Sequence, residues 1–294
     1  MIKYSKEVTA AKSQGRPIVA LESTIISHGL PRPTNLEVAI EVEEIVRSHG
    51  AIPATIAIID GEIFVGLEAD QLIRIANDDN IVKASTRDLA IICATGKSAA
   101  TTVAATSHIA NLADIDVFAT GGLGGVHRGH LYDESADLTE LASTKIIVVC
   151  AGVKSILDVA GTLERLETLA IPVIGFKTSN FPGFYLTDSG FTIEHRVETV
   201  EEIARIWGLR HNLNTDTTAI IIANPVKNQM DLKLHNEILD SGLALATSGH
   251  VTGKDVTPFL LEHFHTTSKG ESLRVNIEII KANSKLAAEI ACAL

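Results

Sequence analysis

The feature of this 294-residue sequence that most constrains its fold is the alternation of short, continuously apolar segments with longer amphipathic ones. Strand-sized apolar runs occur at residues 19–21, 54–59, 117–120, 146–151, 172–176 and 219–223. Helical patterns separate most of them, and the last hundred residues are mostly helical in pattern. Strands that are apolar on both sides are typical of a parallel sheet covered on both faces. We therefore predict an α/β protein with three layers, α/β/α, and a largely parallel central sheet.

The sequence has no visible boundary between domains. It contains no Pro- or Ser-rich linker, no block of charge and no repeat of fixed period. A chain of this length can bury a core large enough to need no disulfide or metal for stability. We therefore predict a single domain over residues 1–294. Cys93, Cys150 and Cys292 are widely spaced in apolar runs, so we expect them to be reduced and buried.

The charge of the chain limits its partners. Acidic residues outnumber basic residues 36 to 25, which gives a formal net charge of −11. This charge repels phosphates, so it argues against binding to nucleic acid or to an anionic membrane. Residues 1–7 lack the apolar core of a signal peptide, and no run approaches the ~20 apolar residues of a membrane span. We therefore expect a cytoplasmic protein whose anionic substrate, if it has one, is held by a local cluster of positive groups and backbone amides.

Polar residues stand at the ends of four predicted strands. They are Glu22, Lys83, Thr120 and Lys154, and the glycine loop 121–125 directly follows Thr120. Ligands bind at the carboxyl ends of strands in open α/β sheets. One such residue alone is more often an exposed loop residue, but several with a glycine loop indicate a site. The chain lacks a complete P-loop or dinucleotide fingerprint, which argues against nucleoside triphosphates and NAD.

The glycine loop 121–125 has two interpretations. Without Cβ atoms its backbone N–H groups can converge on an anion, with charge added by the basic residues that follow, or the loop is a tight turn that needs positive φ. His127, His130 and Asp133 have a spacing that could suit a metal. Oxygen ligands without cysteine favour Mg²⁺ or Mn²⁺. Asp137 opens a helical pattern, so helix capping is the structural alternative for this residue.

Lys154 stands out without any comparison to known families. It follows an apolar strand and precedes a predicted helix, for which Ser155 is a candidate cap and which extends to Ala170. Burial and a nearby helix N-terminus both disfavour an ammonium ion, and a neutral amine is a nucleophile for carbonyl carbon. The alternative is a charged lysine that binds an anion.

A series of strings, in order along nearly the whole chain, carries a family resemblance. They are ALESTIISHG at 20–29, GAIPATI at 50–56, KASTRD at 83–88, ATTVA at 100–104, TGGLGGVHRG at 120–129, SADLTEL at 135–141 and CAGVKSILD at 150–158. FPGFY at 181–185, ANP at 223–225, TPFLL at 257–261 and the terminal helix with Asn276 extend the match. The sequence resembles the pseudouridine-5′-phosphate glycosidases, also described as indigoidine synthase A-like proteins.

The resemblance implies a one-domain α/β/α protein that assembles as a homotrimer and takes part in pseudouridine catabolism. Members of the family cleave pseudouridine 5′-phosphate reversibly to ribose 5-phosphate and uracil, with a divalent metal such as Mn²⁺. The broken bond joins two carbon atoms, so the usual pair of carboxylates acting through an oxocarbenium ion is insufficient. A carbon leaving group needs an electron sink, and an opened ribose joined to lysine as a Schiff base supplies one.

The resemblance also implies roles for particular residues. Lys154 matches the nucleophile, Glu22 the donor of a proton to the uracil carbon, and Asp137 a second acid/base group that helps to open the sugar ring. Asp133 matches the metal ligand. Thr120 and His127 are expected at the phosphate and Asn276 near the base. The positions that match substrate contacts are Lys83, Val103, Thr120, His127, Ser135, Ala136, Asp137 and Asn276.

Two positions depart from the family pattern. His130 lies in a stretch where the family varies in sequence and length, so the resemblance gives it no role. Glu134 stands beside the matched metal ligand, where it either raises metal affinity or is a solvent-facing charge. Two other functions remain open: an aldolase-like lyase that uses Lys154 on a sugar phosphate, and a non-catalytic sugar-phosphate-binding protein.

Overall fold

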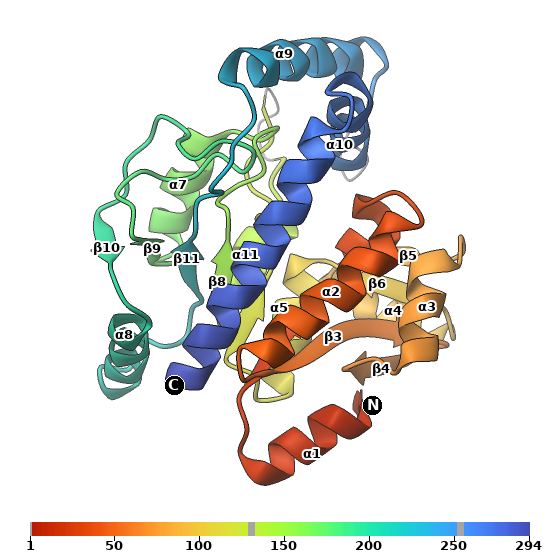
Figure 1. The fold of residues 1–294 in the computed structure, drawn as a ribbon, viewed down its shortest axis with the longest axis vertical. Coiled ribbons are helices and arrows are strands. Elements are labelled where there is room, and N and C mark those ends of the chain that lie inside the picture. Colours follow the sequence, from red (N-terminus) through yellow and green to blue (C-terminus); the bar gives the residue numbers. More distant parts are fainter. Residues whose placement is uncertain (1, 129–132, 252–255) are drawn as a thin grey trace.

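The computed structural model describes residues 2–128, 133–251 and 256–294, and within them eleven strands form one sheet (Figure 1). The strands are β1 (Ile2–Tyr4), β2 (Ile18–Leu21), β3 (Ile52–Ile59), β4 (Glu62–Val65), β5 (Val82–Ala84), β6 (Ala99–Thr101), β7 (Val117–Ala119), β8 (Ile147–Cys150), β9 (Val173–Phe176), β10 (His195–Val197) and β11 (Ile220–Ala223). The helices are α1 (Lys6–Gln14), α2 (Thr34–Ser48), α3 (Ala69–Asn77), α4 (Leu89–Ala94), α5 (Val103–Leu112), α6 (Ala136–Leu141), α7 (Val159–Thr168), α8 (Val200–Asn212), α9 (Leu232–Ser248), α10 (Val256–Thr267) and α11 (Glu271–Ala293). Two short helical turns are η1 (Ile25–Gly29) and η2 (Thr86–Asp88).

Most of the sheet is parallel. The strands lie in the order β1, β4, β3, β2, β7, β8, β11, β9, β10, and β6 joins β5 to β3. From β3 through β2 to β10 all neighbours are parallel. Among the described strands, only β3 with β4 and β3 with β6 pair antiparallel, and the first pair closes through Asp60 and Gly61, both at positive φ. These pairings confirm the predicted α/β fold with a largely parallel sheet.

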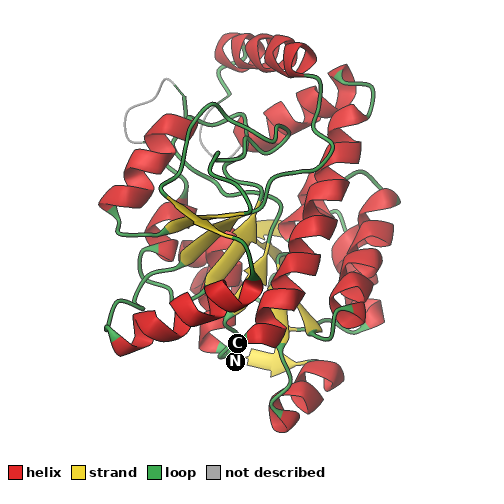
Figure 2. Cartoon of the chain, turned by 60° about the vertical axis from the view of Figure 1, so that its left-hand side comes forward, coloured by secondary structure: helices red, strands yellow, loops and turns green. Residues whose placement is uncertain are grey.

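Helices cover both faces of the sheet, which produces the three predicted layers (Figure 2). Helices α2, α8 and α11 pack on one face, and α1, α5, α6 and α7 pack on the other. Alternate residues of β8 enter the two cores: Ile147 and Val149 belong to the first, and Val148 and Cys150 belong to the second. Because both faces are covered, each strand must be apolar throughout, which explains the continuous apolar runs in the sequence.

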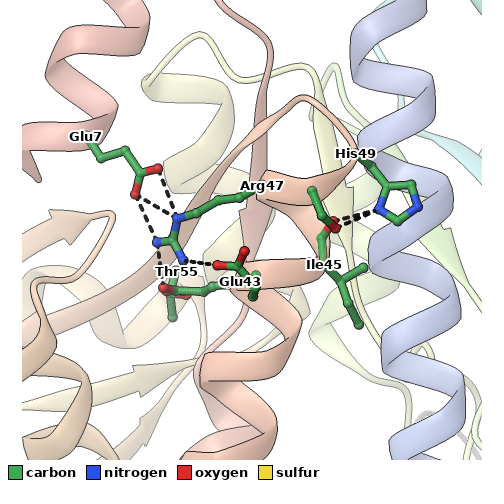
Figure 3. Close-up of polar contacts among 8 residues, drawn as sticks. Glu7, Glu43, Ile45, Arg47, His49 and Thr55 are labelled. Carbon is green, nitrogen blue, oxygen red and sulfur yellow. Dashed lines mark hydrogen bonds and ion pairs between the residues drawn. The ribbon is translucent and has the colours of Figure 1, made fainter.

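A polar network joins α1, α2 and β3 (Figure 3). Arg47 donates to both carboxylate oxygens of Glu7, at 2.9 Å for the shortest pair, and to Glu43 at 3.1 Å. The hydroxyl of Thr55 donates to the other oxygen of Glu43 at 2.7 Å. Burial raises the pKa of Glu43, and the hydroxyl and the guanidinium oppose that shift. The network ties the first helix to the sheet through side chains that are satisfied by one another.

Two local expectations are wrong. Helix α7 begins at Val159 and is capped by Asp158, whose carboxylate accepts the Gly161 N–H, so Ser155 is not its cap and Lys154 is not at its first turn. All three cysteines are free, but only Cys150 is buried, and its burial raises the thiol pKa to about 12. No helix of the described residues is long and apolar enough to cross a membrane.

Candidate active site

A pocket opens at the carboxyl ends of the central strands, beside η1, α10 and α11. It encloses about 510 Å³ of empty space, its open mouth included. Four of the predicted site residues line it: Glu22, Lys83, Lys154 and Asn276. They come from four separate parts of the chain, after β2, in β5, after β8 and in α11. The structure therefore brings the predicted nucleophile and the predicted proton donor to one pocket.

Glu22 is the first residue after β2 and is only 8% exposed. One of its carboxylate oxygens accepts a hydrogen bond from the hydroxyl of Thr120, the first residue after β7. Burial raises the pKa of Glu22, and this effect outweighs the opposing charges of Lys154 and Lys83 and the Thr120 hydrogen bond. A buried carboxyl with a raised pKa holds a proton that it can deliver, which suits a general acid.

Lys154 is half-buried and its backbone lies between two close-packed segments. Its N–H donates to the carbonyl of Leu123 at 3.1 Å, so the residue is tied to the glycine loop. Gly152, two residues earlier, has φ of 80°, and a Cβ there would lie 2.2 Å from the carbonyl oxygen of Pro182. Only glycine fits this position. The tight packing at Gly152 therefore restricts the backbone that leads to Lys154.

The structure contradicts one of the two interpretations of the glycine loop 121–125 and limits the other. None of its glycines has positive φ, so the tight-turn interpretation is wrong. Glycine is needed for close packing instead, since a Cβ on Gly124 would lie 2.2 Å from the hydroxyl oxygen of Ser135. The N–H groups of Leu123 and Gly124 already donate to Gly152 and Asp137, so neither of these two amides is left for an anion.

Asp137 connects the glycine loop to two helix N-termini. It is 6% exposed, and its two oxygens accept the N–H of Ala104 at 3.0 Å and of Gly124 at 2.8 Å. Ser135 caps α6, so Asp137 is not the cap. These bonds bring the starts of α5 and α6, which carry predicted substrate contacts, close to each other. Of those contacts, Val103 is buried and Ala136 is exposed.

Lys83 belongs to the same edge of the sheet as the N-terminus of α5. It lies in β5, and the carbonyl of the next residue, Ala84, accepts the N–H of Thr102, which caps α5. A lysine beside a helix N-terminus is an arrangement that binds anions. This corner of the site therefore supplies positive potential in a protein of net negative charge.

The predicted metal ligand Asp133 is partly exposed. Its carboxylate lies 3.9 Å from Nδ1 of His127, and its carbonyl accepts the His127 N–H. Glu134 pairs with Arg165 at 2.8 Å, so it is not an unpaired solvent-facing charge. His130 lies outside the described residues. Across residues 2–128, 133–251 and 256–294, no group of three metal-ligating side chains is present.

Comparison with known proteins decides the family. The family model described as indigoidine synthase A-like protein matches residues 7–293. The chain belongs to this family. It is 53% identical to a pseudouridine-5′-phosphate glycosidase of Salinispora tropica, over 99% of this chain and 91% of the relative. One from Alkaliphilus metalliredigens is 48% identical over 100% of this chain and 96% of the relative.

Solved structures agree with the fold. An indigoidine synthase A-like protein of Thermotoga maritima has a TM-score of 0.91 and 37% identity, over 99% of this chain and 96% of that chain. The prealnumycin C-glycosynthase AlnA, solved with ribulose 5-phosphate, has a TM-score of 0.92 and 32% identity, over 100% and 97%. The resemblance read from the sequence to the indigoidine synthase A-like family is thus confirmed.

Several pocket residues were not singled out from the sequence. They are Thr24 and His28 in the segment around η1, Phe184, and two residues of α10, Pro258 and Leu261. Partial burial and the charge of Lys83 lower the pKa of His28. The available signal was the string 20–29, which continues past Glu22 through both Thr24 and His28. Phe184 lies in the string 181–185, and Pro258 and Leu261 lie in the string 257–261, so the family resemblance gave the same kind of signal for them.

Proposed function

We propose that this protein cleaves the C–C glycosidic bond of pseudouridine 5′-phosphate to ribose 5-phosphate and uracil, reversibly. The observation that carries the proposal is one pocket that holds a lysine, Lys154, together with a buried carboxyl of raised pKa, Glu22. Relatives that share 48–53% of the sequence over nearly its full length are named for this activity. A structural neighbour that forms C-glycosides was solved with a pentulose phosphate, which supports a sugar phosphate as the ligand class.

The phosphate binds where positive potential is concentrated. Lys83 and the N-terminus of α5, beginning at Val103, form one side of this subsite, and Ser135 and Ala136 at the start of α6 form the other. His127 is proposed to complete the phosphate contacts. Thr120 is expected there as well, but its hydroxyl donates to Glu22 and its N–H donates to Val149, so neither donor is left for a phosphate. Local amides and a lysine offset the repulsion that a dianion meets from a chain of charge −11.

The proposed reaction breaks two bonds of the substrate, C1′–O4′ and C1′–C5. The C1′–O4′ bond breaks, with Asp137 assisting the proton transfer to O4′, and the amine of Lys154 forms a bond to C1′. The nitrogen lone pair then forms a C=N bond, and the electrons of the C1′–C5 bond leave with uracil. Glu22 donates its proton to C5 of the uracil. Water hydrolyses the iminium to ribose 5-phosphate and restores the lysine.

Asn276 is proposed to contact the base. It lies at the junction of this pocket with a second cavity between η1 and the α10–α11 corner. Its side chain is 7% exposed, and a Cβ on Gly121 would lie 3.6 Å from its Oδ1. An amide offers both a donor and an acceptor, which matches the alternating N–H and C=O groups of uracil.

A divalent cation, Mn²⁺ in our proposal, is held by Asp133. Cations of this class bind through one or two carboxylates, with water and substrate oxygens as the remaining ligands. A single partly exposed carboxylate near the proposed phosphate residue His127 fits such a site. When bound, the ion would supply charge that helps to fix the substrate. The homotrimer and the cytoplasmic location remain predictions, and light scattering of the purified protein tests the first.

The decisive experiment is a turnover assay with matched lysine variants. Wild-type protein with Mn²⁺ is expected to release uracil from pseudouridine 5′-phosphate, and Lys154→Ala is expected to release none. Lys281→Ala is the control, because Lys281 is also partly buried but pairs with Glu41 of α2 and does not line the pocket. Borohydride should trap ribose 5-phosphate on the wild type and on the control only. Trapping of an aldol donor such as dihydroxyacetone phosphate, without uracil release, would favour the aldolase-like lyase instead.

If wild type and Lys154→Ala both bind ribose 5-phosphate and neither releases uracil, the protein is a sugar-phosphate-binding protein. If both release uracil at similar rates, the protein is a glycosidase but Lys154 is not its nucleophile. Mass spectrometry of the trapped protein locates the modified lysine directly and separates these cases.

A further inference from the structure

Behind the pocket, a buried asparagine on α11 holds the end of a central strand. Asn283 is 1% exposed, and its amide nitrogen donates to the carbonyl of Thr120 at 2.7 Å. Its amide oxygen accepts from the side chain of Asn224 at 3.0 Å. The backbone N–H of Asn224, the residue after β11, donates to Cys150 at 2.8 Å. The end of β11 therefore fixes the orientation of the Asn283 amide, and this amide in turn holds the end of β7.

Thr120 is the link between this asparagine and Glu22. Its N–H donates to Val149 of β8 at 3.0 Å, its carbonyl accepts from Asn283, and its hydroxyl donates to Glu22. The side chain is completely buried. A continuous series of hydrogen bonds thus runs from Asn224 through Asn283 and Thr120 to the carboxyl of Glu22.

The local backbone gives this contact its importance. Gly121 and Gly122 follow Thr120, and glycine leaves the backbone more conformational freedom than any other residue. The same amide nitrogen of Asn283 also lies 3.4 Å from the carbonyl of Gly121, so it spans the junction between strand and loop. Backbone bonds hold the strand end on the β8 side, from the Thr120 N–H to Val149 and from the Ala151 N–H to the Gly121 carbonyl. Without Asn283 the carbonyl of Thr120 loses its donor on the other side, between these two bonds.

Helix α11 holds Asn283 in a fixed position relative to the pocket. Asn276 and Asn283 are seven residues apart, which is about two turns of an α-helix and places them on one face. Both are buried on a helix of 23 residues that packs along the sheet. The helix that contributes a pocket residue therefore also fixes the strand end that holds Glu22.

We propose that Asn283 is a positioning residue for the proton donor Glu22, and that it acts through Thr120. By fixing the end of β7, it directs the Thr120 hydroxyl at one oxygen of Glu22. The other oxygen is left to carry the proton that is delivered to the substrate. The reaction served here is the one assigned under the proposed function.

The charged groups that act on Glu22 are Lys154, Lys83 and Asp137, and a change at Asn283 alters none of them. The Thr120 hydrogen bond lowers the pKa of Glu22 against the larger effect of burial. A misdirected hydroxyl should therefore raise the pKa of Glu22 further. This direction is specific to the link through Thr120, and a general loosening of α11 that hydrated the site would lower the pKa instead.

The test compares Asn283→Leu, which keeps a similar volume and loses the donor without adding a charge, with Asn283→Ala as a second variant in case the first does not fold. Ser284→Ala is the matched control, since Ser284 is the next residue of α11, is fully buried, and its hydroxyl has no partner within the described structure. We expect kcat for uracil release to fall about 10²-fold in the Asn283 variants, as for a misplaced catalytic group. KM, the borohydride adduct with ribose 5-phosphate and the control should remain close to wild type.

Two further readouts separate positioning from stability. Infrared difference spectra, wild type minus Glu22→Gln, isolate the carboxyl band of Glu22, and its titration midpoint should rise in Asn283→Leu without any substrate present. A double-mutant cycle combines each Asn283 variant with Thr120→Val. The combined variant should have the same kcat as Thr120→Val alone, because both substitutions break the same connection between Asn283 and Glu22.

An unchanged Glu22 midpoint, or effects on kcat that add in full with those of Thr120→Val, would overturn the proposal. So would equal losses of kcat in Asn283→Leu and Ser284→Ala. If wild type released no uracil, the proposed function would fail, but the infrared titration would still decide whether Asn283 controls Glu22.

Discussion

The substitution Glu22→Gln separates the two halves of the proposed reaction. Glutamine keeps the volume of the side chain and an oxygen that can accept from the Thr120 hydroxyl, but it carries no transferable acidic proton. Schiff-base formation with ribose 5-phosphate depends on the amine of Lys154 and should continue. Release of uracil from pseudouridine 5′-phosphate should fail, because the departing carbon receives no proton.

The expected loss of turnover in Glu22→Gln follows from the role of Glu22 as a general acid. A positioned general acid is worth about 10²- to 10⁴-fold, which corresponds to about 3–5 kcal/mol of activation free energy. The structure favours the upper part of this range. Glu22 is 8% exposed, so little water reaches its carboxyl group to replace the lost donor.

A matched control exists elsewhere in the chain. Glu43 is also a glutamate, is 7% exposed, accepts a hydrogen bond from a threonine hydroxyl, and has a pKa raised by burial, but it lies outside the pocket. Glu43→Gln should therefore keep full turnover. The assay follows uracil release and borohydride trapping for wild type and both variants. Turnover of Glu22→Gln within about threefold of wild type would refute the assignment of Glu22 as proton donor.

The same variant has an expected effect on stability. Because the folded-state pKa of Glu22 is raised, the folded protein holds a proton that the unfolded chain releases above about pH 4.5. Ionisation therefore costs stability as pH rises through the folded pKa. Glu22→Gln should melt at a higher temperature than wild type at pH 8, and this gain should disappear at pH 4. Calorimetry at both pH values measures the difference, and a variant less stable than wild type at pH 8 would contradict it.

Three further outcomes follow from contacts described above. Arg47→Met leaves the buried carboxyl of Glu43 without its guanidinium and should lower the free energy of unfolding by about 1–3 kcal/mol in a urea titration. Gly124→Ala forces a Cβ to 2.2 Å from a serine oxygen and should cost about 1–3 kcal/mol, whereas Gly208→Ala, in open space within α8, should be neutral or stabilising. Asp133→Asn should weaken Mn²⁺ binding at least about tenfold by calorimetry, and unchanged affinity would remove Asp133 from the metal site.

The layered fold could be predicted because the sequence information for it is local. In β8 the residues Val148 and Val149 enter opposite cores, and this requirement is visible as an unbroken apolar run. The turn at Asp60 and Gly61 is likewise encoded by two adjacent residues that tolerate positive φ. Ser155 shows the limit of local reasoning: serine and aspartate are both good caps, and the structure places the cap of α7 at Asp158.

The site residues that could be predicted without the family resemblance are those that end or follow a strand. Glu22 and Lys154 directly follow or nearly follow apolar strands, and the topology of a parallel sheet places such residues at one edge. Asn283 follows no strand, and its partner Thr120 is 163 residues away in sequence. Nothing local distinguishes this asparagine from an ordinary polar residue of a helix, so its role is visible only when α11 is packed on the sheet.

The pairing of Glu22 with Lys154 in one pocket has a consequence for the proposed chemistry. Burial raises the pKa of the Glu22 carboxyl, and the charge of Lys154 is the largest effect that opposes this rise. Burial therefore keeps on Glu22 the proton that a general acid must deliver, although a lysine lines the same pocket.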